Sequence, residues 1–487
     1  PFSYDTLRNN MANQRKRKVE NGLVEGRLSR SIWKLAAPMM IGGALLDLFS
    51  IVDLFFVGRL GHIEVAALSI AGTVMAIMMM LVQGIGVGTT ALISHFTGEK
   101  NYEKSDEVLG QTLILGLIGS AIMLVVSFFL IEPLLKLFGA TGEVLTYAAD
   151  YLRINFNYSI IIFLFSGVNS ALQGSGDVRT PLNALIIGNV LNIFLDPLLI
   201  MGYGPFPAMG VSGSAVATVI TRGIGLIYLF GHVLFGHSTI HLGKRHFKPD
   251  PALMQRIVSI GFYASLQVFI REISFLFLMR LVTSYGDVTL AAYGIGSRIR
   301  SFIMVPGFGF ASAAAVLVGQ NLGAGKPERA KKSAWRAVIY YETIAVPVAL
   351  IFLIFAPTIV GIFNDHPEVI TIGSSFLRYL AVTFPFLAFS LVFSQALNGA
   401  GDTRTATIVN AIGQLGFRIP LAYFFARTVG LGYTGVWLGI NASDVVQGVG
   451  MILVFNAGHW QKVFLKHKKK LAYDLEPREI ITELPTN

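Results

Sequence analysis

The chain has 487 residues, of which 53% are hydrophobic and only 14% charged, with a formal net charge of +10. Soluble domains carry about 25% charged residues, so this composition indicates a polytopic membrane protein. No cysteine is present, which excludes disulfides, thiol catalysis and thiolate metal sites, and the basic runs QRKRK at 14–18 and KHKKK at 466–470 suit cytoplasmic anchoring better than nucleic-acid binding.

Long apolar segments recur along the whole chain, and most reach the length of about 20 residues that a helix needs to cross a bilayer. The predicted spans, in chain order, are 32–60, 63–94, 106–137, 145–173, 180–202, 211–236, 254–285, 288–319, 330–361, 369–398, 405–426 and 433–458. The fold class is therefore predicted as all-α, with about twelve transmembrane helices. The loop lysines and arginines place both termini in the cytoplasm and the chain in the inner or plasma membrane.

The two halves of the chain repeat each other. LQGSGDVRT at 172–180 recurs as LNGAGDTRT at 397–405, an offset of 225, and we expect each repeat to form a turn whose aspartate caps the next helix. Each half has an even number of spans, so we predict a parallel repeat of two pseudo-symmetric six-helix lobes. The predicted divisions are an N-terminal tail (1–31), an N-lobe (32–236), a cytoplasmic linker (237–252), a C-lobe (253–458) and a C-terminal tail (459–487).

The stretch NVLNIFLDPLL at 189–199 places Asp196 inside an apolar run. A charged side chain at the bilayer centre costs about 2.5–3.5 kcal/mol, so such an acid must face a polar cavity, be paired or be protonated. Asp53 lies at a similar depth, about 10 Å inside the outer boundary. Asn192 shares a helix face with Asp196, and Pro197 frees a backbone carbonyl nearby. Equal depth allows one proton or sodium site but does not prove contact, and a buried aspartate capping a kinked helix is the alternative.

A second pair of acids follows the internal repeat. The offset of 225 relates Asp47 to Glu272, and both are predicted near mid-membrane, at the interface between the halves. For Glu272 the alternative is an ion pair with Arg271, although sequence neighbours do not face each other on a helix. The deeper acids of the N-terminal half do not recur in the second half, so the ion chemistry is predicted to be biased to the N-lobe.

Several segments resemble the multidrug and toxic compound extrusion (MATE) family over nearly the whole chain. They are PMMIGGALLDLFSIVDLFFVGRLG at 38–61, LNIFLDP at 191–197, GDVTLAAYGIGSRI at 286–299 and VGQNLGAGKPERA at 318–330. The DinF-like branch is the better match, because the acids of the N-terminal half are present, although Glu272 resembles a glutamate typical of NorM-like members.

The resemblance implies secondary antiport, in which cationic or amphiphilic organic compounds leave the cell in exchange for H+ or Na+ by alternating access of the two lobes. By the resemblance, Asp53, Asp196 and Asn192 hold the ion, which makes them a candidate Na+ site, and loading bends the first helix near Pro38. Substrate is expected to compete for the same carboxylates. The other implied site residues are Asn169, Ser214 and Thr218. No cofactor is implied, and the partners are small organic molecules and membrane lipids for a chain expected to act as a monomer.

Two rival functions remain open at this point. A lipid-linked oligosaccharide flippase of the same superfamily needs basic groups in its central cavity, for which Arg271, Arg280 and Arg418 are candidates. A membrane-embedded enzyme is not expected, because neither an HExxH nor a Gly-x-Ser-x-Gly motif is present.

Overall fold

The computed structural model describes residues 23–203, 206–236 and 238–462, and every regular element among them is a helix. Both basic runs of the tails lie outside the described residues. The first half contains α2 (Leu28–Gly58), α3 (His62–Gly98), α4 (Tyr102–Phe129), α5 (Ile131–Leu137), α6 (Gly142–Asn157), α7 (Ser159–Ser175), α8 (Arg179–Ile200) and α9 (Val211–Leu234).

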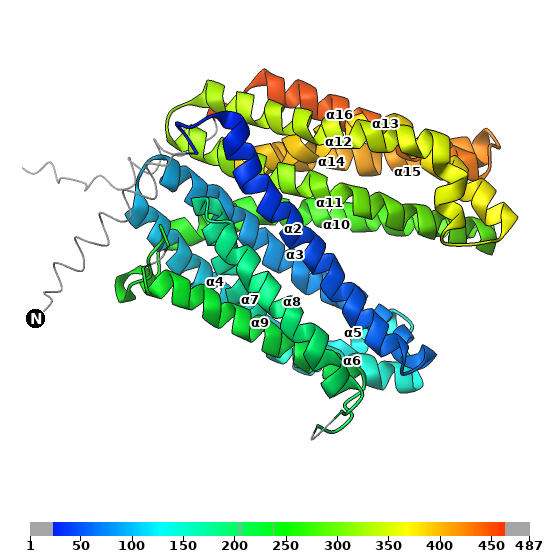
Figure 1. Cartoon of the computed structure of the whole chain (residues 1–487), viewed down its shortest axis with the longest axis horizontal. Coiled ribbons are helices and arrows are strands. Elements are labelled where there is room, and N and C mark those ends of the chain that lie inside the picture. Colours follow the sequence, from blue (N-terminus) through cyan, green and yellow to red (C-terminus); the bar gives the residue numbers. More distant parts are fainter. Residues whose placement is uncertain (1–22, 204–205, 237, 463–487) are drawn as a thin grey trace, which may run out of the picture.

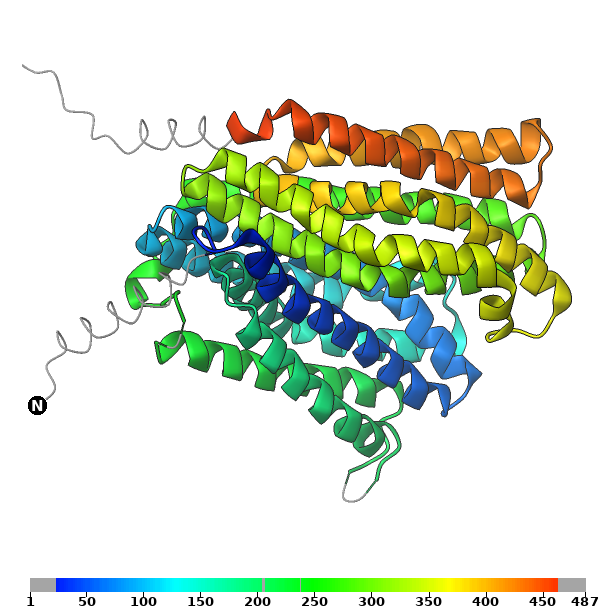
Figure 2. The same ribbon diagram turned by 45° about the horizontal axis from the view of Figure 1, so that its top comes forward.

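The second half follows a short 3-10 turn, η1 (Lys244–Phe247). It contains α10 (Pro251–Thr283), α11 (Asp287–Gly323), α12 (Pro327–Gly361), α13 (Pro367–Gly399), α14 (Thr403–Ala411), η2 (Ile412–Arg418), α15 (Ile419–Tyr423), η3 (Phe424–Thr428) and α16 (Tyr433–Ala457). Figure 1 shows two groups of helices, α2–α9 and α10–α16, that approach each other at one end and separate at the other, and Figure 2 gives a second view.

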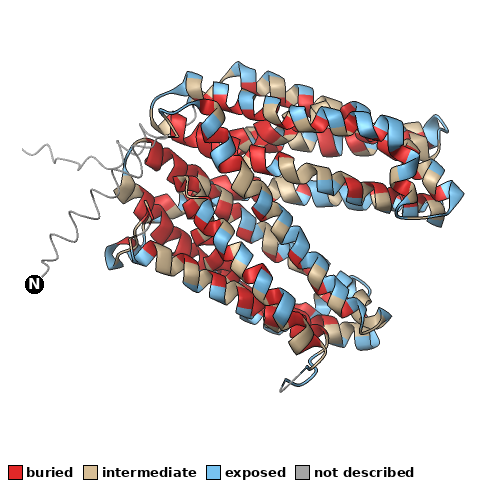
Figure 3. Ribbon diagram, in the orientation of Figure 1, coloured by how far each residue is buried: buried red, intermediate tan, exposed pale blue. Residues whose placement is uncertain are grey.

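Ten described helices are long and apolar enough to cross a membrane, and the bent pair α6 and α7 makes an eleventh if it is one span. α10 is 33 residues long but carries Arg271, Glu272 and Arg280, and it is not in this apolar set. With α10 the total reaches the predicted twelve. Buried residues run along the inside of each group of helices (Figure 3). Two core clusters lie within single groups, and two others combine residues of both groups.

Three predicted spans are interrupted. The span predicted at 106–137 breaks at Leu130, because Pro133 cannot donate its backbone hydrogen bond and crowds the preceding turn. The span predicted at 145–173 bends by 53° at Tyr158, after Asn155 donates its side-chain amide to a main-chain carbonyl one turn back. The span predicted at 405–426 contains two π-helical segments around Pro420, which widen the helix where a donor is missing.

Contacts between the halves show their internal symmetry. A Cβ added to Gly84 of α3 would lie 2.8 Å from the carbonyl of Gly261 on α10, and one added to Gly309 of α11 would lie 3.0 Å from the carbonyl of Ala36 on α2. The offset of 225 relates both residues of one contact to those of the other. Gly98 meets Gln320, and Gly323 meets His95, under the same relation. The interface therefore repeats itself with the halves exchanged, as a parallel repeat requires.

We expect Gly98→Leu to prevent the two lobes from closing at this end. Its Cβ would overlap the backbone carbonyl of Gln320, which cannot change rotamer to avoid the clash. The conformation in which the lobes are separated at this end, the predicted cytoplasmic end, is therefore favoured. Because the chain has no cysteine, Ser312→Cys in the cavity between the lobes supplies a single thiol for labelling. Labelling from the predicted cytoplasmic side should rise several-fold.

Gly72→Leu on the same helix is the matched control, because nothing lies within 4 Å of a Cβ there. Equal labelling of the Gly98 and Gly72 variants would contradict the role given to the close contacts.

The two repeated GxGD segments form the predicted turns. Gly176 and Gly401 have φ of 90° and 80°, which glycine adopts at little cost. Asp177 accepts a hydrogen bond from the backbone of Thr180 at 3.2 Å, and Asp402 caps α14 in the same way. The prediction that these aspartates are helix caps is confirmed.

Asp177 has one partner that Asp402 lacks, since His232 Nε2 lies 3.4 Å from its carboxylate. Burial alone would raise the pKa of Asp177, but hydrogen bonds from His232 and Thr180 outweigh burial and hold the pKa below its ordinary value. A lowered pKa means that this carboxylate stabilises the fold above its ordinary pKa and that the contribution is lost as the pH falls through the lowered value.

Asp177→Ala should therefore lower the free energy of unfolding by about 1–2 kcal/mol at neutral pH, through the lost cap and the lost histidine contact. The unfolding midpoint of the purified protein in detergent measures this loss, which should shrink below about pH 4. Asp402→Ala is the matched control and should cost less. A loss for Asp177→Ala no larger than for Asp402→Ala would show that His232 contributes nothing.

Candidate functional site

Asp53, Asn192 and Asp196 meet between α2 and α8. Asp53 is 8% exposed, and the other two are fully buried. The side-chain amide of Asn192 donates to Asp196 Oδ1 at 3.0 Å and to Asp53 Oδ1 at 3.4 Å, and the two carboxyl groups lie side by side. The structure thus brings together three residues that are 139 and 4 positions apart in the chain.

The side chains of this site offer more oxygen atoms that accept hydrogen bonds than groups that donate them. Asn192 Oδ1 and Asp196 Oδ2 are buried without a hydrogen-bond partner, and so are the hydroxyl groups of Ser214 and Thr218 on α9. Ser214 adjoins Asp53, and Thr218 lies one turn further along α9. Two adjacent buried carboxylates cannot both keep a negative charge without a counter-charge. The group therefore fits a proton, or a hard cation such as Na+ that prefers oxygen ligands.

Two further residues act electrostatically on this acid pair. Tyr151 on α6 is close enough to interact with both carboxylates, and Arg222 on α9 interacts with Asp53. Sequence reasoning missed both. Arg222 lies inside the predicted span 211–236, so the cost of a deep charge, which revealed Asp196, was a signal for Arg222 as well. A tyrosine is common in membrane spans and gave no such signal.

A cavity of about 360 Å³ lies beside the acid pair. Its wall is formed by α2, α3, α7, α8 and α9 of the N-lobe, with Phe308 and Ser312 from α11. Of the predicted site residues, Pro38, Asn169 and Thr218 line it. A second cavity of about 230 Å³ shares part of this wall and reaches α13.

The acid pair is set back from this space. Asp53, Asn192 and Asp196 are not among the residues that line either cavity. α2 joins the two features, because it carries Asp53 of the acid pair and Pro38 of the cavity wall.

A family model described as MatE matches residues 38–198 and again residues 264–424. The chain belongs to the MatE family. One match falls in each half, in agreement with the internal repeat.

Known members resemble the chain over almost its whole length. The "Probable multidrug resistance protein YoeA" of Bacillus subtilis is 27% identical over 445 residues, which are 90% of this chain and 95% of that protein. The "Probable multidrug resistance protein NorM" of Thermotoga maritima is also 27% identical, over 89% of this chain and 94% of that protein. A crystal structure of a MATE protein in the bent conformation superimposes with a TM-score of 0.84 at 27% identity, covering 92% of this chain and 98% of the other.

The MatE chain is therefore a multi-pass membrane transporter of a multidrug efflux family, and this family indicates transport rather than catalysis. The division between the DinF-like and NorM-like branches stays a prediction.

Asp47 and Glu272 lie apart from the acid pair of this MatE transporter. Asp47 is exposed on α2, and Glu272 is exposed on α10, where Arg271 Nε lies 3.5 Å from its carboxylate. Neither acid lines the two cavities. The ion pair with Arg271, which helix geometry argued against, is present because both side chains are long enough to bend toward each other.

The C-lobe of the MatE transporter has a charge cluster in which arginines outnumber acids, unlike the acid pair of the N-lobe. Asp444 on α16 is 2% exposed and pairs with Arg300 at 3.1 Å and with Arg418 at 2.6 Å. The positions related to Asp53 and Asp196 by the repeat are Leu278 and Leu421. A buried acid bonded to two guanidinium groups has a permanent counter-charge, so this cluster is a structural element and not an ion carrier.

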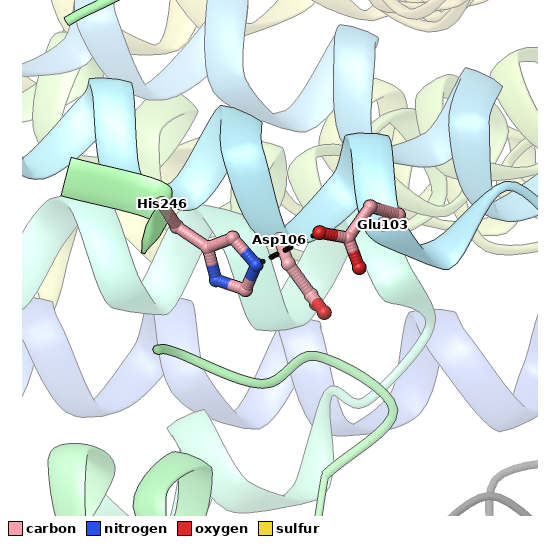
Figure 4. A group of neighbouring side chains, drawn as sticks. All are labelled: Glu103, Asp106 and His246. Atoms are coloured by element: carbon pink, nitrogen blue, oxygen red, sulfur yellow. Dashed lines mark hydrogen bonds and ion pairs between the residues drawn. The ribbon is translucent and has the colours of Figure 1, made fainter. Parts of the chain in front are cut away.

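Glu103, Asp106 and His246 form a group of metal-ligand type at one end of the N-lobe (Figure 4). The ring Nδ1 of His246 accepts from the backbone of Gly243 at 3.1 Å, while Nε2 lies 3.2 Å from Glu103 Oε1 and 3.1 Å from Arg245 Nε. Asp106 accepts from the backbone of His241 at 2.8 Å. These contacts hold the linker between the lobes against α4.

Proposed function

We propose that this MatE transporter exports amphiphilic organic compounds in exchange for H+ or Na+, with the ion carried by Asp53, Asn192 and Asp196. The observation that carries the proposal is the pair of adjacent buried carboxyl groups with unpartnered oxygens beside a cavity of about 360 Å³. A buried acid pair with no basic hydrogen-bond partner favours reversible loading by a small cation.

Coupling follows from the position of α2. The competition of ion and substrate for the same carboxylates, which the sequence predicted, does not fit two acids that lie outside the cavity wall. We infer instead that loading Asp53 changes the bend of α2 near Pro38 and so changes the shape of the cavity. Such a change drives export only if substrate binds the two openings of the transporter with different affinity.

Several finer points of the proposal come from the sequence. They are the N-in and C-in topology, action as a monomer in the inner or plasma membrane, and alternating access of the lobes. The predicted substrates are cationic or amphiphilic compounds, and the proposal keeps the amphiphilic class. Two of the arginines predicted for the rival flippase are paired, Arg271 with Glu272 and Arg418 with Asp444, and neither lines the cavities. The basic residue that does line the larger cavity is Arg222 on α9.

Reconstitution of the purified chain into proteoliposomes tests the proposal. A proton gradient and a sodium gradient are imposed separately, and the movement of an amphiphilic dye is followed. Transport that follows one gradient identifies the coupling ion. Dye movement that follows neither gradient would overturn ion-coupled export.

A further inference from the structure

The charges on the residues that line the 360 Å³ cavity are not balanced between positive and negative. Its neutral polar residues include Gln83, Asn169, Gln173 and Thr218, and no aspartate or glutamate lines it. Arg222 is the one charged residue among those that line this cavity. A guanidinium keeps its charge in a protein, so the wall of the cavity is positive.

Arg222 has no hydrogen bond or ion pair to another described residue. Its guanidinium lies 5.1 Å from the ring centre of Phe49 and 5.3 Å from that of Phe165. The side chain is half-buried, so part of it remains open to the cavity. An intramembrane arginine of this kind is expensive to keep and marks a functional position by default.

The aromatic wall does not favour a cation either. Phe165 lines the cavity and already faces Arg222, so a second positive group on this ring would meet like charge. The flexible side chains of Met39, Met75 and Met79 supply an adaptable apolar surface for the body of a ligand.

We propose that Arg222 binds the acid group of the transported compound, so that this cavity selects amphiphilic organic anions: a carboxylate, sulfonate or phosphate on an aromatic or aliphatic body. The inference rests on the proposed transport function and names its substrate class. The planar fork of the guanidinium matches such groups with two parallel hydrogen bonds.

This assignment limits how ion and substrate are coupled. A cation on Asp53 removes negative charge near Arg222, which strengthens the attraction between Arg222 and an anion. Electrostatics alone would therefore favour joint binding. Exchange therefore requires that the movement of α2 weakens substrate binding by more free energy than this attraction adds.

Two xanthene dyes of opposite charge test the substrate class with the full-length chain in proteoliposomes. Eosin Y is an anion at neutral pH, and rhodamine 123 is a cation with the same ring system. We expect wild type to transport eosin Y faster than rhodamine 123. Arg222→Gln should lower the ratio of the two rates at least about tenfold, which is the effect of losing hydrogen bonds to a charged group.

Arg222→Lys keeps the charge without the fork and should retain an intermediate ratio, and it replaces Arg222→Gln in the test if that variant does not fold. Arg59→Gln is the matched control, because Arg59 also lies over a phenylalanine ring, at 4.5 Å, but not in the cavity wall. Its ratio should equal that of wild type.

Faster transport of rhodamine 123 by wild type, or an equal loss of both dyes in the Arg222 variants, would overturn the substrate class while leaving ion-coupled export intact. Failure of both dyes to follow any ion gradient would instead overturn the proposed function itself.

Discussion

Asp196→Asn should abolish gradient-driven efflux while the protein still folds and reaches the membrane. Asp196 is fully buried next to Asp53, and under the proposed function its carboxyl group takes up the coupling proton or cation. An amide has nearly the same shape but neither takes up a proton near neutral pH nor supplies a negative ligand. Dye efflux from proteoliposomes under an imposed gradient should fall to the level of protein-free vesicles.

Asp47→Asn provides the comparison on α2, where the acid is exposed and outside the cavity wall. It should keep most of the gradient-driven efflux. Full activity of Asp196→Asn would refute the ion site, and equal loss in both variants would show that coupling is not confined to the buried pair.

Asp444→Ala should have the largest effect on stability. The substitution leaves Arg300 and Arg418 without their shared acid in a site where Asp444 is 2% exposed. Removal of one partner from a buried ion pair costs about 3–5 kcal/mol, because the remaining charge stays buried without compensation. The thermal midpoint of the purified protein in detergent, read by size-exclusion chromatography after heating, measures this loss.

Asp150→Ala is the control for this measurement. Asp150 lies 3.6 Å from Arg153, and the two side chains are 48% and 46% exposed. Exposed pairs contribute about 0–1 kcal/mol, so its midpoint should barely move. A shift for Asp444→Ala as small as that for Asp150→Ala would mean that the buried arginines find other partners.

The residues of the buried acid pair were predictable as candidates because one physical rule applies to them. A carboxylate in an apolar run is costly and must face a polar cavity, be paired or be protonated. This cost identified Asp53 and Asp196, and the helical spacing of four residues added Asn192. Their contact was not predictable, since equal depth does not fix which helix faces lie together. The same rule missed Arg222. The role of Glu272, which lies 3.5 Å from Arg271, stays a prediction.

The fold was predictable for the same kind of reason. Apolar length indicated the spans, and the offset of 225 indicated the repeat that the contacts of Gly84 and Gly309 confirm. The bend at Tyr158 was not predictable, because neither proline nor glycine marks it. The family indicates the class of transporter, whereas the substrate charge that we propose rests on Arg222, one residue on α9.

The glycine contacts between the lobes are placed to serve as the pivot for a rotation of one lobe against the other. They occupy α3 from Gly84 to Gly98 and the matching part of α11, and the 22 residues of α3 that precede Gly84 extend about 33 Å beyond them. A tilt of about 10° at the contacts would displace the far end of such a helix by about 6 Å. Because the backbones are in close contact there, the lobes have almost no freedom to slide at this position. A small rotation about the contacts therefore produces a large change in the width of the opening between the lobes at the far end.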